Sequence, residues 1–204
     1  MNTCIRLARP ADAPAIQAIY APVVTSTPTS FEVTPPTIEE MRERLEQKLL
    51  THPWIVYETQ GRVVGSAYAG AYRARAAYQW SVEVSVYLHE QWRGQGIGRA
   101  LYTSLFALLR LQGFFSVYAG ITLPNPASVA LHERMGLRPV GLYHQVGYKL
   151  GAWHDVGWWQ GTLQPHAQAP AAPLSLGEAQ TLDSWEAALT SGTAFSGELP
   201  RPLG

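Results

Sequence analysis

Two periods of apolar residues alternate along the first 163 positions and predict a mixed α/β fold. Apolar runs typical of strands cover residues 5–8, 54–59, 63–72, 81–88 and 115–121. Helices are predicted at residues 10 to about 24, 38 to about 50 and 100–112, and from residue 125 onward. Two closing strands follow before residue 163. This alternation favours helices packed on a single sheet.

Local signals mark where several of these elements begin and end. Thr37 and Glu40 have the spacing of a capping box, in which each side chain accepts a hydrogen bond from the other residue's backbone at a helix start. Gln60 and Gly61 predict the turn of a hairpin, and Gly113 is a good helix C-cap. The boundaries are therefore best defined around the second helix, the hairpin and the third helix.

The amino-acid composition of the chain changes near residue 164. Residues 166–173 are rich in Ala and Pro and are typical of a linker. The segment 183–186 has a capping pattern and predicts a short helix to Leu189, with Trp185 and Leu189 on one face. We therefore divide the chain into a domain at 1–163 and a linker with a tail at 164–204. Two alternatives remain for the tail: it is mobile, or it docks on the domain or a partner subunit.

Composition narrows the class of protein. Fifteen basic and fifteen acidic residues cancel among 204, so neither nucleic acid nor a membrane surface is expected as a partner. One cysteine, Cys4, excludes an internal disulfide, and the histidines lack metal-ligand spacing, so no metal is expected. Without a signal peptide or an 18-residue apolar stretch, the expected location is cytoplasmic.

A glycine-dense loop at residues 93–99 follows the strand at 81–88 and precedes a helix. Such a loop presents backbone N–H groups at the positive end of a helix, where phosphate binds. A nucleotide P-loop would need a Lys-Ser or Lys-Thr pair, which is absent, and the dinucleotide motif would need glycine where Arg99 stands. The pattern Arg-x-x-Gly-x-Gly, built on Arg93, Gly96 and Gly98, remains. A tight glycine turn without a ligand is the alternative.

This loop and a second motif resemble the GNAT superfamily of N-acetyltransferases. The second motif, at residues 125–137, carries Asn125, Ser128, Leu131, Glu133 and Gly136 at the spacing of the superfamily's Asn-x-x-Ser/Ala-x-x-Leu-x-Glu-x-x-Gly signature. Residues 68–78 and 146–160 are similar to the phosphinothricin acetyltransferase branch. The resemblance covers roughly residues 4–163. It implies a mixed, mostly antiparallel sheet of six or seven strands, splayed at its centre.

The resemblance also implies acetyl-CoA as cosubstrate. The loop would hold the pyrophosphate, the end of the preceding strand would pair with the pantetheine arm, and two residues of the second motif would face the cosubstrate. These candidate residues are Val86, Tyr87, Leu88, Arg93, Gly94, Gln95, Gly96, Ile97, Gly98, Arg99, Asn125 and Ser128. For the side chains of Arg93 and Arg99, exposure to solvent is the alternative.

Glu83 is the candidate base that deprotonates the amine. Period-two alternation places Glu83 on the face of the strand opposite to that of Val82 and Val84. Burying a carboxylate within an apolar strand costs free energy unless the carboxylate is used in function or paired. An ion pair with Arg73, Arg75 or Lys149 is the structural alternative. His132 stands where many members of the superfamily have a tyrosine proposed to protonate the leaving thiolate, so His132 is a second candidate catalytic residue. The alternative for His132 is a structural role in packing.

The acceptor is expected to be a small amino acid or analogue of the phosphinothricin, methionine sulfoximine or methionine sulfone type. Candidate substrate-binding residues are Phe31, Arg73, Arg75, Tyr78 and Trp80, with the arginines forking onto an acidic group. Branch members are usually homodimers, so a homodimer is expected, with Lys149, Trp153 and Asp155 structural or at its seam. A protein N-terminus or a polyamine as acceptor, or a non-catalytic acyl-CoA sensor, are the rival functions.

Overall fold

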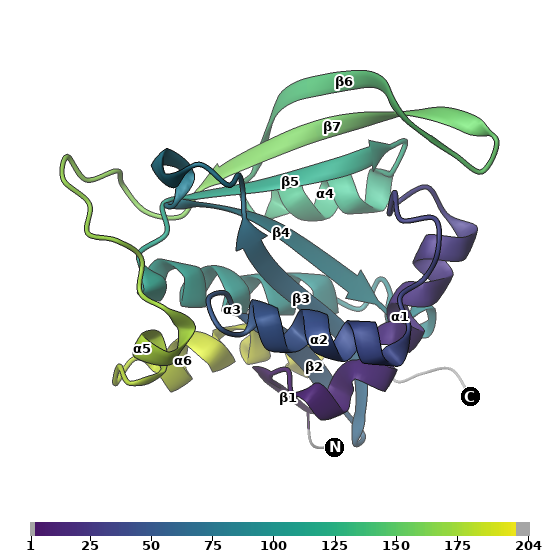
Figure 1. Ribbon diagram of the computed structural model, residues 1–204. Coiled ribbons are helices and arrows are strands. Elements are labelled where there is room, and N and C mark those ends of the chain that lie inside the picture. The colour runs from purple at the N-terminus through teal and green to yellow at the C-terminus, as the bar shows by residue number, and fades with distance from the viewer. Residues whose placement is uncertain (1–2, 199–204) are drawn as a thin grey trace.

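A seven-stranded mixed sheet runs through the protein, whose computed structural model describes residues 3–198 (Figure 1). Its strand order is β1-β2-β3-β4-β5-β7-β6. The strands are β1 (Thr3–Leu7), β2 (Trp54–Thr59), β3 (Arg62–Ala71), β4 (Ser81–Leu88), β5 (Ser116–Leu123), β6 (Arg138–Lys149) and β7 (Ala152–Thr162). Every neighbouring pair is antiparallel except β4 and β5, which are parallel. The predicted mixed, mostly antiparallel sheet is confirmed.

The two central strands separate along their length. β4 and β5 pair at three positions, with Ser81 opposite Ser116, Val82 opposite Val117 and Glu83 opposite Tyr118. Beyond these pairs the strands diverge, as Figure 1 shows. The edge of β4 from residue 84 onward therefore faces an opening instead of a neighbouring strand, and the predicted splay is confirmed.

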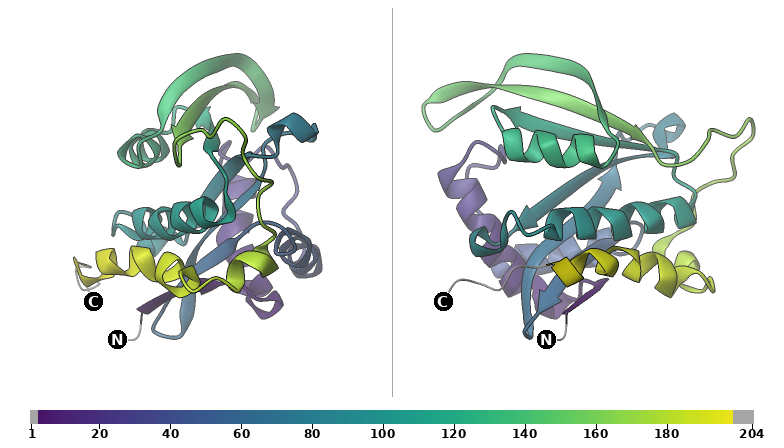
Figure 2. Two further views of the ribbon diagram at one scale, coloured as in Figure 1. Left: turned by 90° about the vertical axis from the view of Figure 1, so that its left-hand side faces the viewer. Right: turned by 180° about the vertical axis from the view of Figure 1, so that it is seen from behind.

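Helices cover both faces of the sheet (Figure 2). α1 (Ala13–Ser26) and α2 (Ile38–Lys48) lie on one face, and α3 (Ile97–Gln112) and α4 (Pro126–Arg134) lie on the other. The predicted capping box begins α2: Thr37 Oγ1 accepts from Glu40 N at 3.2 Å, and Glu40 Oε2 accepts from Thr37 N at 2.7 Å. Gly113 ends α3 in the left-handed conformation that favours glycine.

Each face of the sheet has its own apolar core. Leu101 and Leu105 of α3 pack on the face that carries Val82 and Val84 of β4. The opposite face, toward α1 and α2, packs residues such as Met41 in a second core. Because alternate residues of β4 point to opposite faces, Glu83 belongs to the side of α1 and α2.

The C-terminal segment folds back on the domain. It contains α5 (Leu176–Gln180), α6 (Trp185–Thr190) and a 3₁₀ segment (Ser191–Glu198), and α6 and the 3₁₀ segment contact α3 and β1. Trp185 and Leu189 are buried in the core of the α3 face. Beyond them, Gly192 N donates to Ser104 Oγ of α3 at 3.0 Å.

The helix predicted near Trp185 is present, but Ser184 at its N-cap makes no side-chain capping bond. A capping box that the sequence analysis missed lies earlier, at Ser175 and Glu178, and begins α5. Within residues 3–198, no helix combines the length and apolar character that crossing a membrane requires.

Candidate active site

The opening between β4 and β5 leads into a groove of about 420 Å³, here called the β4–α4 groove. All the predicted cosubstrate residues line it except Gln95, whose side chain instead donates to the Gln91 carbonyl at 2.9 Å. Three residues at the end of α1 and just after it, Val23, Thr27 and Thr29, also line the groove, as do Ala127, Ala130, Leu131 and Arg134 of α4. The sequence analysis missed the three near α1, because no motif marks them and they lie about 60 residues before the strand they face.

The glycine loop shapes one end of the groove. Gly94 and Gly96 have φ angles of +75° and +79°, a conformation that favours glycine. A Cβ at Gly98 would lie 3.1 Å from Leu131 Cδ2, so the absence of a side chain allows α3 and α4 to approach each other closely. Gly96 is the N-cap of α3 and the first helical turn holds no acidic residue. Its unpaired N–H groups and the helix dipole form a site for an anion.

The two arginines of this loop differ in their surroundings. Arg93 Nε donates to the Leu88 carbonyl at 3.4 Å, which ties the loop to the end of β4. The Arg99 guanidinium lies over the ring of Phe195 in the C-terminal segment, 4.1 Å from the ring centroid. Both residues line the β4–α4 groove, so the loop contributes two cations to it.

His132 lies in a small cavity of about 60 Å³ at the base of the splay. Its Nδ1 is 2.8 Å from the Ser128 carbonyl, which can only accept, so Nδ1 carries the proton. Its Nε2 is 3.0 Å from the Tyr102 hydroxyl and therefore accepts from it. Burial lowers the pKa of the imidazole, although the bond to Ser128 opposes this effect. His132 is thus a neutral, fully engaged side chain, and Tyr102, a partner that sequence analysis missed, is also buried.

Glu83 lies on the opposite face of β4, at the last position where β4 pairs with β5. Burial raises the pKa of its carboxyl above the ordinary value, and the cations Arg73 and Lys48 oppose that rise. A carboxylate with a raised pKa and partial exposure suits a base that works near neutral pH. Of the cations proposed from sequence as its partners, Lys149 instead donates to the Ser30 carbonyl at 2.6 Å.

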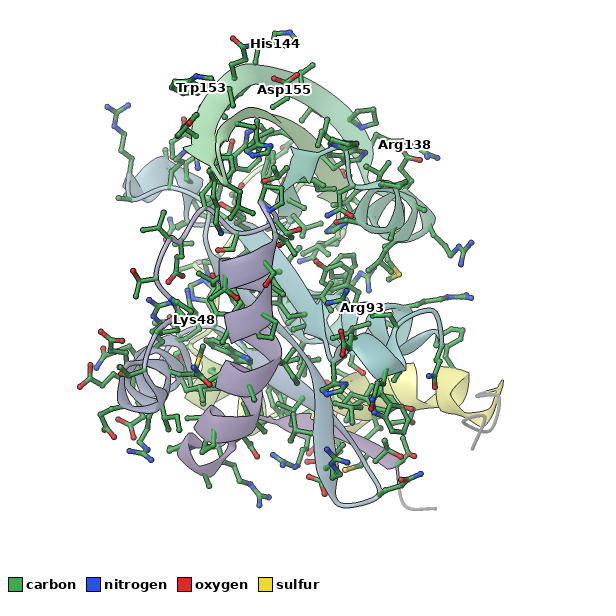
Figure 3. All side chains as sticks on the ribbon, turned by 90° about the vertical axis from the view of Figure 1, so that its right-hand side faces the viewer. Lys48, Arg93, Arg138, His144, Trp153 and Asp155 are labelled. Atoms are coloured by element: carbon green, nitrogen blue, oxygen red, sulfur yellow. The ribbon has the colours of Figure 1, made fainter. Side chains whose placement is uncertain are left out.

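Lys48, at the C-terminal end of α2, is a neighbour of Glu83 that the sequence analysis missed. Its Nζ lies 2.6 Å from the point where a Cβ of Gly70 would stand, and Gly70 is directly opposite Glu83 in the β3–β4 ladder. Figure 3 shows Lys48 and Arg93 on opposite sides of these central strands. Burial lowers the pKa of the Lys48 ammonium, and Glu83 raises it. A lone lysine at a helix end carries no motif, so only the fold reveals this proximity.

A larger cavity, of about 500 Å³, lies between α1, α2 and strands β2 to β4, and is here called the α1–α2 cavity. Lys48, Tyr68 and Tyr87 are among its lining residues. Tyr87 also lines the β4–α4 groove and the small cavity at His132. Tyr87 of β4 is therefore common to the lining of all three spaces.

The predicted substrate residues lie outside these three spaces. The Arg73 guanidinium stacks over the ring of Tyr72, 4.3 Å from the ring centroid. Its positive charge lowers the pKa of the Glu83 carboxyl. Tyr78 packs edge-on against Tyr72, while Arg75 is exposed. Trp80 Nε1 donates to the Ala171 carbonyl at 2.8 Å, which ties it to the C-terminal segment.

Phe31, the fifth predicted substrate residue, also lies outside these three spaces. Its ring lies against Gly147 of β6 at a separation that leaves no room for a Cβ there. The five residues come from two segments, residue 31 after α1 and residues 73–80 between β3 and β4, and none of them lines the three spaces described above. A single slot formed by these aromatics and arginines stays a prediction.

The β6–β7 hairpin extends from the sheet and exposes apolar residues. Tyr148 and Trp153 are 61% and 60% exposed and pack edge-on against each other. Figure 3 shows Trp153, His144 and Asp155 together on this hairpin, where His144 Nδ1 is 3.3 Å from Asp155 Oδ2. Asp155 also accepts from Gln145 N at 2.7 Å and so stabilises the local bend of β6.

Known proteins share this arrangement. A family model described as an acetyltransferase (GNAT) domain matches residues 5–158. The phosphinothricin N-acetyltransferase of Streptomyces viridochromogenes is 41% identical over 172 residues, 84% of this chain and 94% of that protein. The L-methionine sulfoximine/L-methionine sulfone acetyltransferase of Pseudomonas aeruginosa is 34% identical over 172 residues, 83% of this chain and all of that protein.

A solved structure extends the similarity to three dimensions. The phosphinothricin acetyltransferase of Sinorhizobium meliloti, in complex with acetyl-CoA, matches with a TM-score of 0.78 and 34% identity. The match covers 86% of this chain and 99% of that one.

Proposed function

The chain belongs to the GNAT family of acetyltransferases, and on that premise we propose that it acetylates the α-amino group of a small amino acid or amino-acid analogue. It is an enzyme, and acetyl-CoA is its cosubstrate. The observation that supports the proposal best is the position of Glu83: it is the last residue of β4 that pairs with β5, and it precedes by three residues Val86, the first residue of β4 that lines the groove for the cosubstrate.

The chain's own residues bind acetyl-CoA along the β4–α4 groove. The N–H groups of the glycine loop and of the first turn of α3 donate to the pyrophosphate, and Arg93 and Arg99 add positive charge. The free edge of β4 beyond Glu83 offers backbone groups to the pantetheine arm in place of a neighbouring strand. Asn125 holds the start of α4, because its side chain accepts from Ser128 N at 3.2 Å.

Acetyl transfer follows by direct attack of the amine on the thioester. Glu83 takes a proton from the ammonium group through a water, and the neutral nitrogen attacks the carbonyl carbon. A backbone N–H of β4 at the splay donates to the oxyanion of the tetrahedral intermediate. The C–S bond then breaks and the thiolate of CoA leaves, while the acetyl group remains on nitrogen. The nitrogen releases its remaining extra proton to the thiolate through water, which leaves the neutral amide and the free thiol of CoA. A thiolate is a stable leaving group, so the neutral His132 is a minor contributor to this step.

An amino-acid analogue fits the proposal better than the rival acceptors. The two relatives described above are named for phosphinothricin and for methionine sulfoximine or methionine sulfone. The charged groups that act on the Glu83 carboxyl are two cations, Arg73 and Lys48. They favour an acceptor with an acidic group and disfavour a polyamine.

We also propose that two copies of the chain form a homodimer through the β6–β7 hairpin. Val140, Leu142, Val146, Tyr148 and Trp153 are exposed along this hairpin. Several large apolar side chains exposed on one hairpin are typical of an interaction site. Sedimentation should give the mass of a dimer for the wild-type chain and of a monomer for Trp153→Asp. A monomeric wild type would contradict the proposal.

The function is tested by free-thiol release from acetyl-CoA with a panel of acceptors. The panel contains phosphinothricin, methionine sulfoximine, methionine sulfone, common amino acids, a polyamine and a peptide that begins with Ala or Ser. Turnover of the first three is expected. Turnover of the peptide or the polyamine alone would refute the proposed acceptor class. Binding of acetyl-CoA without turnover of any acceptor would instead favour a sensor.

A further inference from the structure

The C-terminal segment lies outside the part of the chain that matches the family, and it packs against the helix that begins at the glycine loop. The family model ends at residue 158, whereas α5 begins at Leu176. α6 and the 3₁₀ segment lie alongside α3 and contact it (Figure 2). The family match therefore gives no role to a structural element that lies beside α3.

The segment is attached at both ends of α3. At the C-terminal end, Gln112 Nε2 donates to the Leu174 carbonyl at 2.9 Å, and Leu174 N donates to the Gln112 carbonyl at 2.8 Å. At the N-terminal end, Gly192 approaches the helix so closely that a Cβ there would overlap the carbonyl oxygen of Ala100. Phe195 follows three residues later and is partly buried against the core of the α3 face. Its position is therefore set relative to the first turns of α3.

Phe195 contacts one residue of the β4–α4 groove. Arg99 lies in the first turn of α3 and lines the groove, and its guanidinium lies over the Phe195 ring, 4.1 Å from the ring centroid. Phe195 does not line the groove, so the ring supports the guanidinium without filling the space of a ligand. No hydrogen bond or ion pair within residues 3–198 engages the Arg99 guanidinium, and its N–H groups are therefore available to a ligand.

The contact with Phe195 reduces the entropy that binding would cost. An arginine free in solvent samples many rotamers, and ordering the side chain on a phosphate costs free energy. A cation–π contact restricts this sampling before the ligand arrives. The other arginine of the loop, Arg93, is restrained in a different way, through the bond from its Nε to the Leu88 carbonyl. Each of the two loop arginines thus has its own restraint.

We propose that Phe195 is a positioning residue of the cosubstrate site and holds the Arg99 guanidinium ready to bind a phosphate of acetyl-CoA. Guanidinium N–H groups match the oxygens of a phosphate well. The inference rests on the proposed function, in which the glycine loop and its arginines bind these phosphates. The phosphate belongs either to the pyrophosphate or to the 3′-phosphate of CoA. Both offer the same oxygen ligands, and the experiment separates them.

The experiment measures by calorimetry the Kd of acetyl-CoA, CoA and 3′-dephospho-CoA. The proteins are the wild type, Phe195→Ala, Phe195→Leu, Phe195→Tyr, Arg99→Ala and the double variant Arg99→Ala/Phe195→Ala. Phe195→Leu is the matched control, because it keeps an apolar side chain against the core but has no aromatic ring. All measurements are made well below the Tm of every variant, so that a loss of stability alone does not change Kd.

Phe195→Ala and Phe195→Leu should each weaken the binding of acetyl-CoA by about 2- to 5-fold, the effect of losing an exposed cation–π contact, and Phe195→Tyr should retain wild-type binding. Arg99→Ala should weaken binding by about 10-fold or more, because a hydrogen bond to a charged group is lost. In the Arg99→Ala background, Phe195→Ala should have no further effect, since Phe195 acts through Arg99.

The two CoA ligands identify the phosphate. If Arg99 binds the 3′-phosphate, the effect of Phe195→Ala appears with CoA and is absent with 3′-dephospho-CoA. If Arg99 binds the pyrophosphate, the effect is equal with both ligands. Either pattern supports the proposal.

Other outcomes overturn it. Wild-type affinity in Phe195→Ala excludes the positioning role, and tighter binding would show that the segment competes with the cosubstrate. Wild-type affinity in Phe195→Leu would reduce the role of the ring to packing, and an undiminished effect of Phe195→Ala in the Arg99→Ala background would show that it does not act through Arg99. In each case a weakened Arg99→Ala leaves the proposed function standing. If Arg99→Ala itself binds acetyl-CoA like the wild type, the role given to Arg99 in the proposed function fails as well.

Discussion

Replacing Lys48 with methionine should shift the pH dependence of catalysis in a direction that the geometry fixes. Lys48 Nζ lies beside Gly70, directly across the ladder from Glu83, and its charge lowers the pKa of that carboxyl. Removing the charge destabilises the carboxylate relative to the acid, so the pKa of Glu83 rises. A base must be ionised to accept a proton. In a plot of kcat against pH, the acid limb, along which kcat falls as the base becomes protonated, should therefore move to higher pH.

The size of the shift follows from the positions of the two groups. Cβ atoms of directly opposed residues are roughly 5 Å apart, and Nζ is 2.6 Å from the Cβ position of Gly70. A separation of about 7 Å between the charges gives about 2.4 kcal/mol at an effective dielectric constant of 20. That energy corresponds to about 1.7 pH units. Because Glu83 is partly exposed, water screens the pair, and we expect a shift of about one unit.

The assay is kcat at saturating acetyl-CoA and methionine sulfone between pH 5 and 9, because kcat reports ionisations in the ternary complex. Lys48→Arg is the matched control, since it keeps the charge and should leave the limb in place. Glu83→Gln should remove the limb and lower kcat by about 10²-fold or more.

An acid limb that stays in place in Lys48→Met, or moves to lower pH, would refute the electrostatic coupling between the two residues. If Glu83→Gln also retains near-normal turnover, Glu83 is not the base, and the raised pKa of its carboxyl is a consequence of burial alone.

Three other variants test separate parts of the structure. Gly96→Glu places a carboxylate at the proposed anion site, at a φ of +79° that disfavours residues other than glycine. Calorimetry should therefore detect no binding of acetyl-CoA while the circular dichroism spectrum stays unchanged, and retained binding would contradict the role assigned to the loop. Tyr102→Phe removes the donor to His132 Nε2, and we expect a Tm lower by about 2–4 °C with little change in kcat; a fall in kcat of about 10²-fold would instead place the pair in proton transfer. Gly192→Ala drives a Cβ into the carbonyl of Ala100, so Tm should fall by about 3–10 °C and hydrogen exchange in the C-terminal segment should increase; unchanged melting would show that the segment contributes no stability.

Much of the fold could be predicted because its signals are local. The capping box at Thr37 and the terminal glycine at Gly113 act within one helical turn, and both are formed as predicted. Alternation along β4 correctly separated Val82 and Val84 from Glu83, because a strand buried on one face imposes a period of two. The glycine loop was recognisable for the same reason: its backbone requirements lie within seven consecutive residues.

The parts of the site that sequence missed depend on register between distant segments. Lys48 approaches Glu83 because α2 ends beside Gly70, which lies opposite Glu83 in the β3–β4 ladder. Val23, Thr27 and Thr29 line the β4–α4 groove because the end of α1 lies beside it. Each of these residues alone has an ordinary structural explanation. The arginines and aromatics of the β3–β4 loop were conspicuous in the sequence because they form a compact cluster of charged and aromatic residues, and their role in binding the acceptor stays a prediction.

The position of Glu83 connects the two halves of the proposed reaction. A strand has two edges and two faces, and β4 uses them for different partners. Its edge loses a neighbour after Glu83, which frees backbone groups for the proposed contact with the cosubstrate, while its face toward α1 and α2 carries the carboxylate of the proposed base. Extending the β4–β5 pairing by two residues would occupy the backbone groups that the cosubstrate needs. Shifting the register of β4 by one residue would turn Glu83 into the α3 core. The proposed reaction needs the amine and the thioester to meet where the edge opens and the face carries a base, and Glu83 is the residue of β4 at which the edge opens and the face carries a carboxylate.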